Sequence, residues 1–491
     1  MGALEAGPGA LRPPGDEPKD PVMCAPSFRA ARLRPAVALL ALASLSCSRT
    51  AREDGGSSLA SPGRHFGESV QVTPSVARRL RAIIEGGPAR DDAAFMKVGD
   101  SLTVNCNSLC CFAAASGQPV DLDGREALAQ TIAHFDRPLT PGGESSWDRS
   151  SEAASLGVWS GWPLAPSDDG RAAPLLREID AIDPRFAVVM LGTNDLAGTS
   201  LEHWVGPKGL RAYATNLTAI VDALTARGVI PLLTYIPPVY AEEARRRFTP
   251  AFNAIVRGVA VAARVPTIDC YSEMAELGPS SISPDGVHPA YDTRSACILT
   301  PEGLRFGFNV RNLRTLETLH AVRVALFEDQ VSVPEAPEIE GAATASAPLV
   351  IASLPFAVAL AGEGPNTSSP LRDYRACGGQ DGADGAEWIL RLHLDSAAPL
   401  RVIAVPPRGE CEAGGGPGVR CDGSRDVSVA LFAGNLEASS CLAAHSTLLE
   451  RRVPAGDYFV VVDTYRGAKG PEYVVLTVDR CLADDPRCAG E

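Results

Sequence analysis

The sequence predicts two folded regions, an α/β domain followed by an all-β domain. In the first region, short apolar strand candidates alternate with helical patterns, which is typical of a parallel sheet covered by helices. After residue 348 the pattern changes to short alternating runs separated by Gly-rich turns, which is typical of a β-sandwich. The length agrees with this division, because 491 residues are too many for one average domain.

The α/β elements follow one another along residues 74–328. A first helix is predicted to begin near Pro74 and to stop at Gly86-Gly87. Continuous apolar runs predict buried strands, and periodic apolar positions predict helices. The expected strands are 95–98, 186–191, 229–235 and 267–270, and the expected later helices are 210–226, 241–263 and 309–327. The chemistry of such a domain should lie at the carboxyl ends of its strands.

Composition predicts the other boundaries. Residues 48–73 are rich in Ser, Gly and charge and are interpreted as a flexible tether, and residues 329–348 are a Pro/Ala/Glu linker. Residues 349–491 are then a β-sandwich accessory domain. Its strands are expected at 388–394, 400–405, 427–432, 458–463 and 473–478.

The N-terminus carries an export pattern. Three arginines between positions 29 and 34 precede an apolar run from Ala36 to Leu45, and Cys47 follows after one small residue. This resembles a bacterial lipoprotein signal, which implies that Cys47 is lipidated and becomes the mature N-terminus. We therefore expect residues 1–47 to be an upstream extension and signal peptide, and the protein to be held by its lipid anchor alone at the outer membrane, periplasm or cell surface. A buried N-terminal helix with an ordinary cysteine is the alternative.

Charge argues against one class of partner. The net charge is −14, and after the N-terminal region the longest basic run is Arg245-Arg246-Arg247. Nucleic-acid binding depends on clustered positive charge, so no nucleic-acid partner is expected.

Export would fit the cysteines, because disulfides persist in oxidising compartments. Five cysteines lie in the α/β region, so one must stay free or pair elsewhere, and six in the β region can pair in fifteen ways. Three cysteines of the α/β region, Cys106, Cys110 and Cys111, lie in one short loop. There we favour a disulfide at the rim of the pocket over a zinc site, because no histidine lies at ligand spacing. The two groups are Cys106, Cys110, Cys111, Cys270 and Cys297, and Cys377, Cys411, Cys421, Cys441, Cys481 and Cys488.

Three motifs at strand ends carry candidate chemistry. Gly99-Asp100-Ser101-Leu102 puts a serine on the turn that leaves a strand, where its hydroxyl can be exposed. Gly192-Thr193-Asn194-Asp195 supplies a side-chain amide suited to an oxyanion. Asp285-Gly286-Val287-His288 supplies an imidazole base and a carboxylate that can orient it. Each motif alone is compatible with an ordinary turn, but their conjunction in this order indicates a serine hydrolase. The other six histidines are interpreted as structural.

On these blocks the sequence resembles the SGNH, or GDSL-type, hydrolase and esterase family over residues 95–326. The resemblance implies a flavodoxin-like three-layer α/β/α fold, with Ser101 as nucleophile, His288 as general base and Asp285 as its orienting carboxylate. No cofactor and no catalytic metal are expected.

The resemblance also implies an oxyanion hole. Its donors would be the backbone N–H of Ser101, the side chain of Asn194 and the backbone N–H of a glycine in a second block. We choose Gly157 for that glycine, with Gly161 as the competitor.

The expected function is that of an exported serine esterase that hydrolyses a small ester, a lipid or an acylated glycan through an acyl-enzyme. A carbohydrate O-acetyl esterase is one alternative, and a non-catalytic surface binding lipoprotein is another. Residues 454–478 resemble the pre-peptidase C-terminal modules of secreted bacterial enzymes. Asp422, Asp426 and Asp463 are candidate calcium ligands there, with turn and surface roles as the simpler interpretation.

Overall fold

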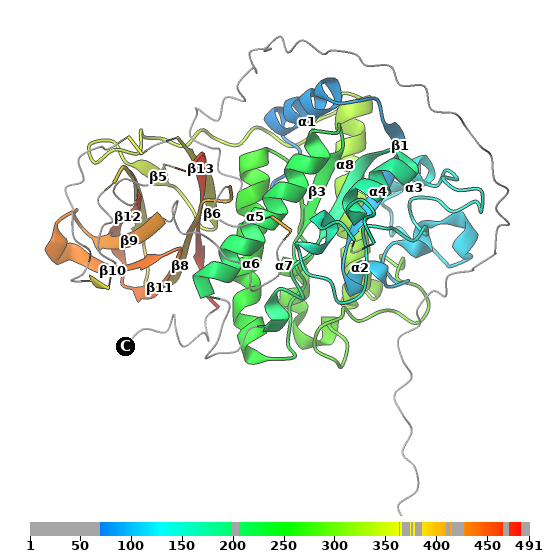
Figure 1. The fold of residues 1–491 in the computed structure, drawn as a ribbon. Helices are drawn as coiled ribbons and strands as arrows, with labels where there is room; N and C mark the ends of the chain where they lie inside the picture. Colours follow the sequence, from blue (N-terminus) through cyan, green and yellow to red (C-terminus); the bar gives the residue numbers. More distant parts are fainter. Residues whose placement is uncertain are drawn as a thin grey trace, which may run out of the picture. The chain divides into compact units, whose positions relative to one another are not determined.

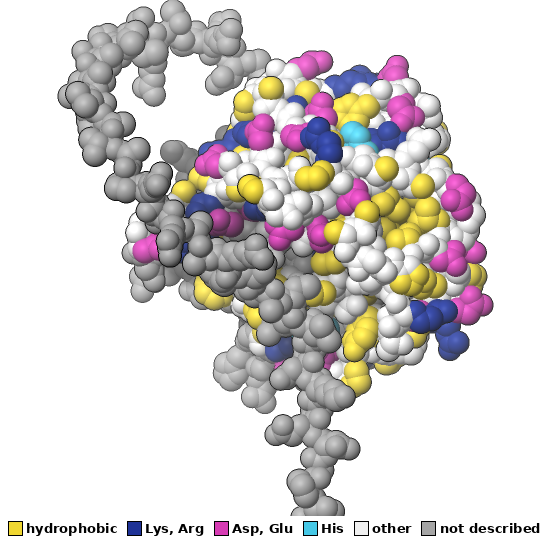
Figure 2. Space-filling view, turned by 90° about the vertical axis from the view of Figure 1, so that its right-hand side faces the viewer, with side chains coloured by type: hydrophobic (Ala, Val, Ile, Leu, Met, Phe, Trp, Pro, Cys, Tyr) yellow, Lys and Arg dark blue, Asp and Glu magenta, His cyan; other side chains and the backbone are white. Residues whose placement is uncertain are grey.

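The computed structural model describes residues 69–482 apart from several gaps, and it contains an α/β region followed by a β region, as the sequence predicts (Figure 1). Among the described residues, none of the helices is both long and apolar enough to cross a bilayer. On the face drawn in Figure 2, acidic and basic side chains are interspersed with hydrophobic and polar ones. The gaps are 168, 199–205, 363, 366–373, 375–376, 379–384, 409–412, 415–426 and 465–470.

The α/β region is built on a parallel sheet. Its strands lie in the order β1 (Asp91–Gly99), β2 (Pro184–Met190), β3 (Ile230–Thr234) and β4 (Thr267–Ile268). Gly99 also forms a parallel bridge with Ala154. Its N–H donates to the Ala153 carbonyl, and its carbonyl accepts the Ser155 N–H. Because Ala154 precedes β2 in the chain, this bridge completes the order 2-1-3-4-5 of flavodoxin-like folds.

Helices cover both faces of this sheet (Figure 1). On one face, α8 packs against α1 and α3, and on the other α5 packs against α6. The turn after β1 forms the short helix α2, and α7 lies beside α8. The bounds are α1 (Pro74–Gly86), α2 (Ser101–Val104), α3 (Ala127–Phe135), α4 (Pro174–Ile182), α5 (Gly206–Thr225), α6 (Glu243–Ala263), α7 (Tyr271–Leu277) and α8 (Gly307–Phe327).

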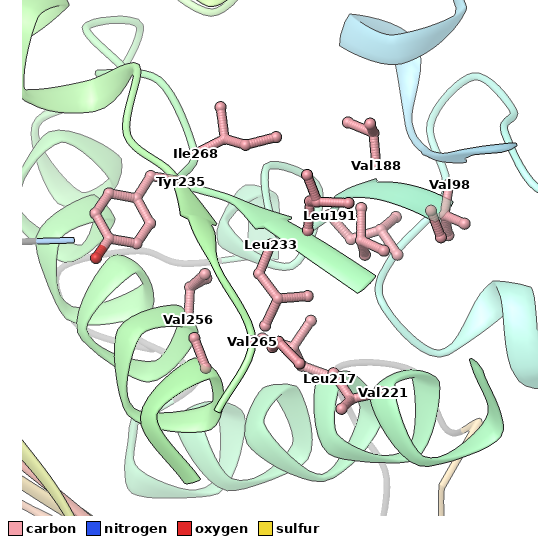
Figure 3. Packing of buried hydrophobic residues seen from close by; sticks show 14 of the residues in the cluster. Val98, Val188, Leu191, Leu217, Val221, Leu233, Tyr235, Val256, Val265 and Ile268 are labelled. Atoms are coloured by element: carbon pink, nitrogen blue, oxygen red, sulfur yellow. The ribbon is translucent and has the colours of Figure 1, made fainter. Parts of the chain in front are cut away.

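The sheet and its helices share a buried apolar core. Figure 3 shows Leu217 and Val221 of α5 and Val256 of α6 beside Leu233 of β3, and all four are at most 3% exposed. Burial of such a side chain stabilises the fold by about 1.5–3 kcal/mol. Strands covered on both faces must be apolar throughout, which is why continuous apolar runs predicted them.

The ordered part of this region begins earlier than expected. Residues 48–73 were predicted as a tether, but Val70 and Val72 are buried in the core. The Val70 N–H donates to Thr267 Oγ1 at 2.8 Å, and the Thr267 N–H donates to the Val70 carbonyl. The chain therefore packs against β4 before α1 begins.

The β region forms two sheets. A five-stranded sheet has the order β10-β9-β12-β7-β5, and a four-stranded sheet has the order β11-β8-β13-β6. Side chains such as Trp388, Leu392 and Val460 belong to one buried apolar cluster together with residues of both sheets. The strands are β5 (Leu349–Ile351), β6 (Phe356–Ala361), β7 (Glu387–Leu394), β8 (Ala398–Val405), β9 (Val427–Ala433), β10 (Cys441–Ser446), β11 (Leu448–Val453), β12 (Gly456–Thr464) and β13 (Tyr473–Arg480).

The four-stranded sheet packs against α6. A side chain at Gly258 could not fit there, since its Cβ would lie 2.1 Å from Val475 Cγ1. Arg257, on the same helix, forms a buried ion pair with Asp479. The apolar core of the α/β region accordingly extends to Val475 and Val405 of the β region.

Asp463 is not a turn or surface residue, contrary to the simpler sequence interpretation. It is 1% exposed and lies directly opposite Glu387, which is 0% exposed, on the neighbouring strand. Burial, reinforced by the Glu387 charge, raises the pKa of Asp463 to about 8. Tyr374 donates its hydroxyl hydrogen to Glu387 Oε1 at 3.0 Å. The other two candidate calcium ligands, Asp422 and Asp426, lie outside the described residues.

This carboxylate makes stability depend on pH. Because the folded-state pKa of Asp463 lies above its ordinary value, the folded state binds more protons between about pH 4 and 8, so stability falls as pH rises through that window. Asp463→Asn removes the titration and is expected to raise the unfolding free energy by several kcal/mol at pH 8 but not at pH 4. Melting temperatures at both pH values measure this. Asp180→Asn, at an exposed residue of α4, should change neither. An equal shift of Asp463→Asn at both pH values would contradict the assignment.

Candidate active site

The candidate nucleophile lies on the turn between β1 and α2. β1 ends at Gly99, and Asp100 caps α2 by accepting the Leu102 N–H at 3.0 Å on its Oδ1. Ser101 is the first residue of the helix and is half-buried. Amides in the first turn of a helix have no acceptor within the helix, so the Ser101 N–H can serve an external oxygen.

Ser101, His288 and Asp285 form one hydrogen-bonded chain. His288 Nε2 lies 2.9 Å from Ser101 Oγ, and His288 Nδ1 lies 2.6 Å from Asp285 Oδ2. The other carboxylate oxygen of Asp285 accepts the backbone N–H groups of Val287 and His288 at 2.9 and 3.0 Å. The fold thus brings together a serine and a histidine that are 187 residues apart in the chain.

The surroundings of Asp285 favour its charged form. Partial burial raises the pKa of this carboxyl, but hydrogen bonds from the Val287 and His288 amides and from the His288 ring outweigh it, so the pKa is lowered. A carboxylate beside Nδ1 holds the proton of a neutral imidazole on that nitrogen. The lone pair of Nε2 is then directed at the Ser101 hydroxyl.

Asn194 binds the residue that follows Gly157. Asn194 follows β2, and its Nδ2 donates to the Val158 carbonyl at 2.9 Å. Gly157, directly before Val158, is exposed and has a φ of 69°, in the left-handed region that favours glycine. Gly161 is buried and precedes a 3-10 turn that starts at Trp162.

Asp195 and Ser160 hold the segment around Gly157, and sequence reasoning gave neither a role. Asp195 Oδ2 accepts the Ser160 N–H at 2.9 Å, and its Oδ1 accepts the Ser160 hydroxyl at 2.6 Å. Burial raises the pKa of Asp195, opposed by these two hydrogen bonds. A carboxyl directly after Asn194 was the one local signal of such an anchor.

Asp100 and Arg311 form a second support, beneath α2. Asp100 is fully buried, and burial raises its pKa to about 6, opposed by the Leu102 amide and the Arg311 charge. The buried Arg311 guanidinium, on α8, donates to the Leu102 carbonyl and to Thr103 Oγ1. The turn carrying Ser101 is therefore tied to a helix more than 200 residues away.

A disulfide joins the segments that follow the two motifs. Cys111, after Ser101, is bonded to Cys297, after His288, which confirms a disulfide in the cysteine-rich loop. Cys106 is also disulfide-bonded, whereas Cys110 and Cys270 are thiols. In the β region, Cys377 is bonded to Cys441, and Cys481 is disulfide-bonded as well.

Among the described residues, neither a cluster of metal ligands nor the described pocket coincides with the candidate site residues. In the part of the chain that the structure describes, no three His, Cys, Asp or Glu side chains gather as metal ligands would. A pocket of about 660 Å³ lies beside α8 and β4, lined by Val70, Asp269 and Arg314 among others, and no candidate site residue contributes to it. The predicted lipidation site, Cys47, lies outside the described residues.

Solved structures and curated proteins were compared with this chain. Among solved structures, Axe2, an acetylxylan esterase from Geobacillus stearothermophilus, is 16% identical with a TM-score of 0.29, and the match covers 48% of this chain and 95% of that one. LAE5, an alpha/beta hydrolase enzyme from the metagenome of Lake Arreo, Spain, is 17% identical with a TM-score of 0.29, and the match covers 48% and 98%. A search of curated proteins found no match.

The family comparison covers all three strand-end motifs. Residues 98–292 match the model of the GDSL-like Lipase/Acylhydrolase family, and the match ends well before the β region. Residues 98–292 therefore belong to the GDSL-like lipase and acylhydrolase family, and this protein is an ester-bond hydrolase.

Proposed function

We propose that this protein is a serine esterase that hydrolyses an O-acyl ester through an acyl-enzyme on Ser101. The observation that carries the proposal is the hydrogen-bonded chain from Ser101 Oγ through the His288 ring to Asp285. A serine hydroxyl is a poor nucleophile at neutral pH and becomes effective when an oriented imidazole accepts its proton.

The reaction has two balanced halves. Ser101 Oγ bonds to the ester carbonyl carbon as His288 Nε2 takes its proton, and the tetrahedral intermediate then expels the alcohol, which receives that proton. Water next attacks the acyl-enzyme with His288 again accepting a proton, and the acid leaves as Ser101 recovers its hydrogen. Asp285 stabilises the imidazolium in both halves.

The oxyanion that forms in each half needs donors. We assign these to the backbone N–H of Ser101, the side chain of Asn194 and the backbone N–H of Gly157. The Asn194 amide carries two hydrogens, and with one on the Val158 carbonyl the second can serve the oxyanion. Gly157 is favoured over Gly161 because it is exposed and directly precedes Val158, whose carbonyl Asn194 binds, whereas Gly161 is buried.

A carbohydrate O-acetyl esterase is the second candidate. Trp159, two residues after Gly157, is 39% exposed. Tyr291, three residues after His288, is 44% exposed. Such rings offer flat apolar faces with a polar edge, which suits the apolar face of a sugar ring. Acetylated xylan and p-nitrophenyl acetate should both be cleaved if this candidate is right, and Trp159→Ala should weaken only the first reaction.

Export with lipidation of Cys47 remains a proposal from the sequence pattern. The Cys111–Cys297 and Cys377–Cys441 disulfides support it, because such bonds persist in oxidising compartments.

Labelling with a serine-directed fluorophosphonate tests the esterase proposal. One adduct per chain is expected, on Ser101, because only an activated serine attacks this phosphorus at a useful rate. His288→Ala should slow labelling by about 10²–10⁴-fold. Mass spectrometry locates the adduct and time courses give the rate.

A histidine outside the site supplies the control. His134, whose Nε2 contacts the Asp92 carbonyl, can be replaced by alanine and should leave labelling unchanged. Folded wild-type protein that forms no adduct would instead support the non-catalytic binding lipoprotein.

A further inference from the structure

A row of hydrogen bonds runs from the β region to the segment that carries Gly157. Gly414, between β8 and β9, donates its N–H to Oδ1 of Asn216 on α5 at 2.9 Å. Asn216 Nδ2 donates to Ser160 Oγ at 3.1 Å, and Ser160 Oγ donates to Asp195 Oδ1 at 2.6 Å. We call Gly414, Asn216, Ser160 and Asp195 the relay.

The chemistry of its two ends fixes the direction of the relay. A backbone N–H can only donate and a carboxylate can only accept, so Asn216 must turn its oxygen to Gly414 and its nitrogen to Ser160. The Ser160 hydroxyl then accepts from Asn216 and donates to Asp195. Asn216 is 2% exposed and Ser160 is 0% exposed, so water cannot readily replace a lost hydrogen bond there.

The relay ends beside both assigned oxyanion donors. Ser160 lies three residues after Gly157, and Asp195 directly follows Asn194. The segment 157–160 is therefore held at two points, since Asn194 binds the Val158 carbonyl and the relay binds Ser160.

The β region also contacts the residues that follow segment 157–160 in the chain. A Cβ atom built at Gly414 would lie 3.9 Å from the Gly161 carbonyl oxygen and 3.8 Å from Leu164 Cβ. The described part of the β8–β9 connection thus packs on the loop that carries Gly157, in addition to its hydrogen bond with Asn216.

We infer that the C-terminal β domain positions the oxyanion hole through the relay, with Asn216 as the positioning residue. The inference rests on the proposed roles of Asn194 and Gly157. It gives the accessory domain a part in catalysis rather than in binding alone. A displacement of about 1 Å in a catalytic group can cost about 10²-fold in rate, so a partly loosened segment should cost about 10-fold.

Two substitutions in the full chain break the relay from opposite sides. Asn216→Ala removes its centre, and Gly414→Pro removes the N–H donor and replaces a φ of 89° by about −65°. Each variant should lower kcat for p-nitrophenyl acetate and the fluorophosphonate labelling rate by about 10-fold, while KM changes little, because the oxyanion forms after substrate binding.

Two further variants separate positioning from a general loss of packing. Asn216→Asp keeps the acceptor for Gly414 but cannot donate to Ser160 when ionised, so it should lower kcat as much as Asn216→Ala. Asp222→Ala removes another contact between α5 and the β region, the 2.6 Å bond from Arg408, and should leave kcat unchanged.

The outcomes are distinguishable. Wild-type kcat in Asn216→Ala, or in Gly414→Pro, would overturn the inference, and so would an equal loss in Asp222→Ala. A wild-type protein without a Ser101 adduct would overturn the proposed function itself. An adduct that forms equally fast in wild type and Asn216→Ala would overturn the positioning role alone.

Discussion

Ser101→Ala is expected to lower kcat for p-nitrophenyl acetate by about 10⁴–10⁶-fold. Alanine removes the oxygen that would carry the acyl group, and the remaining oxyanion donors and binding contacts can account for only a small residual rate. The side chain is half-buried and its hydroxyl contacts His288, so its removal should cost only about 1 kcal/mol of unfolding free energy. Steady-state kinetics and thermal unfolding of the same preparation measure both quantities.

A serine outside the site controls for this substitution. Ser280, which donates its hydroxyl hydrogen to the Leu277 carbonyl, is exposed and can be replaced by alanine with no expected change in kcat. Retention of more than about a tenth of the activity by Ser101→Ala would mean that another group attacks the ester.

The predicted strands are those whose surroundings leave a strong pattern. β2 is buried at every position, and β9, β12 and β7 lie inside their sheet, so their apolar runs or alternation were visible. The four strands that the sequence did not predict, β5, β6, β10 and β11, are all edge strands, paired on one side only. An edge strand needs less apolar sequence because part of it meets solvent or a helix.

Four helices were not predicted, for a related reason. α2 has four residues and α7 has seven. α3 and α4 have nine residues each, and neither begins with a side-chain cap. Without a capping residue and with little more than two turns, the helical period is hard to separate from chance. α1 was predicted because Pro74 stands in its first turn, its apolar positions recur at helical spacing and Gly86-Gly87 ends it.

In the candidate site, too, residues in local motifs could be expected from the sequence, whereas the residues that support them could not. The hydrogen-bonded chain of Ser101, His288 and Asp285 could be expected because each lies in a short motif at a strand end. The catalytic roles of these residues and of Asn194 stay predictions. The supporting contacts could not be expected, because each pairs residues that are distant in the chain. Asp195 reaches Ser160 across 35 residues, and Cys111 reaches Cys297 across 186. The glycine donor stays a prediction.

Asn194→Ala is expected to lower kcat by about 10²–10³-fold with little change in KM, since the amide would bind the oxyanion more strongly than the ground-state carbonyl. The substitution also removes the donor to the Val158 carbonyl, so part of the loss would come from the segment that carries Gly157. Asn194→Asp separates these effects, because a carboxylate of the same shape repels the oxyanion and should lose more activity than alanine. Fluorophosphonate should still label both variants on Ser101, but more slowly.

Asn107→Ala is the matched control for this amide. Its Nδ2 donates to Asn105 Oδ1 in the loop after α2, so the variant removes an amide near Ser101 that has no assigned contact with substrate. Its kcat should equal that of the wild type. A rise in KM for Asn194→Ala at unchanged kcat would contradict the oxyanion role, because uniform binding of substrate and transition state changes KM alone. Asn194 would then hold the ester in the ground state, and the backbone donors at Ser101 and Gly157 would have to stabilise the oxyanion without it.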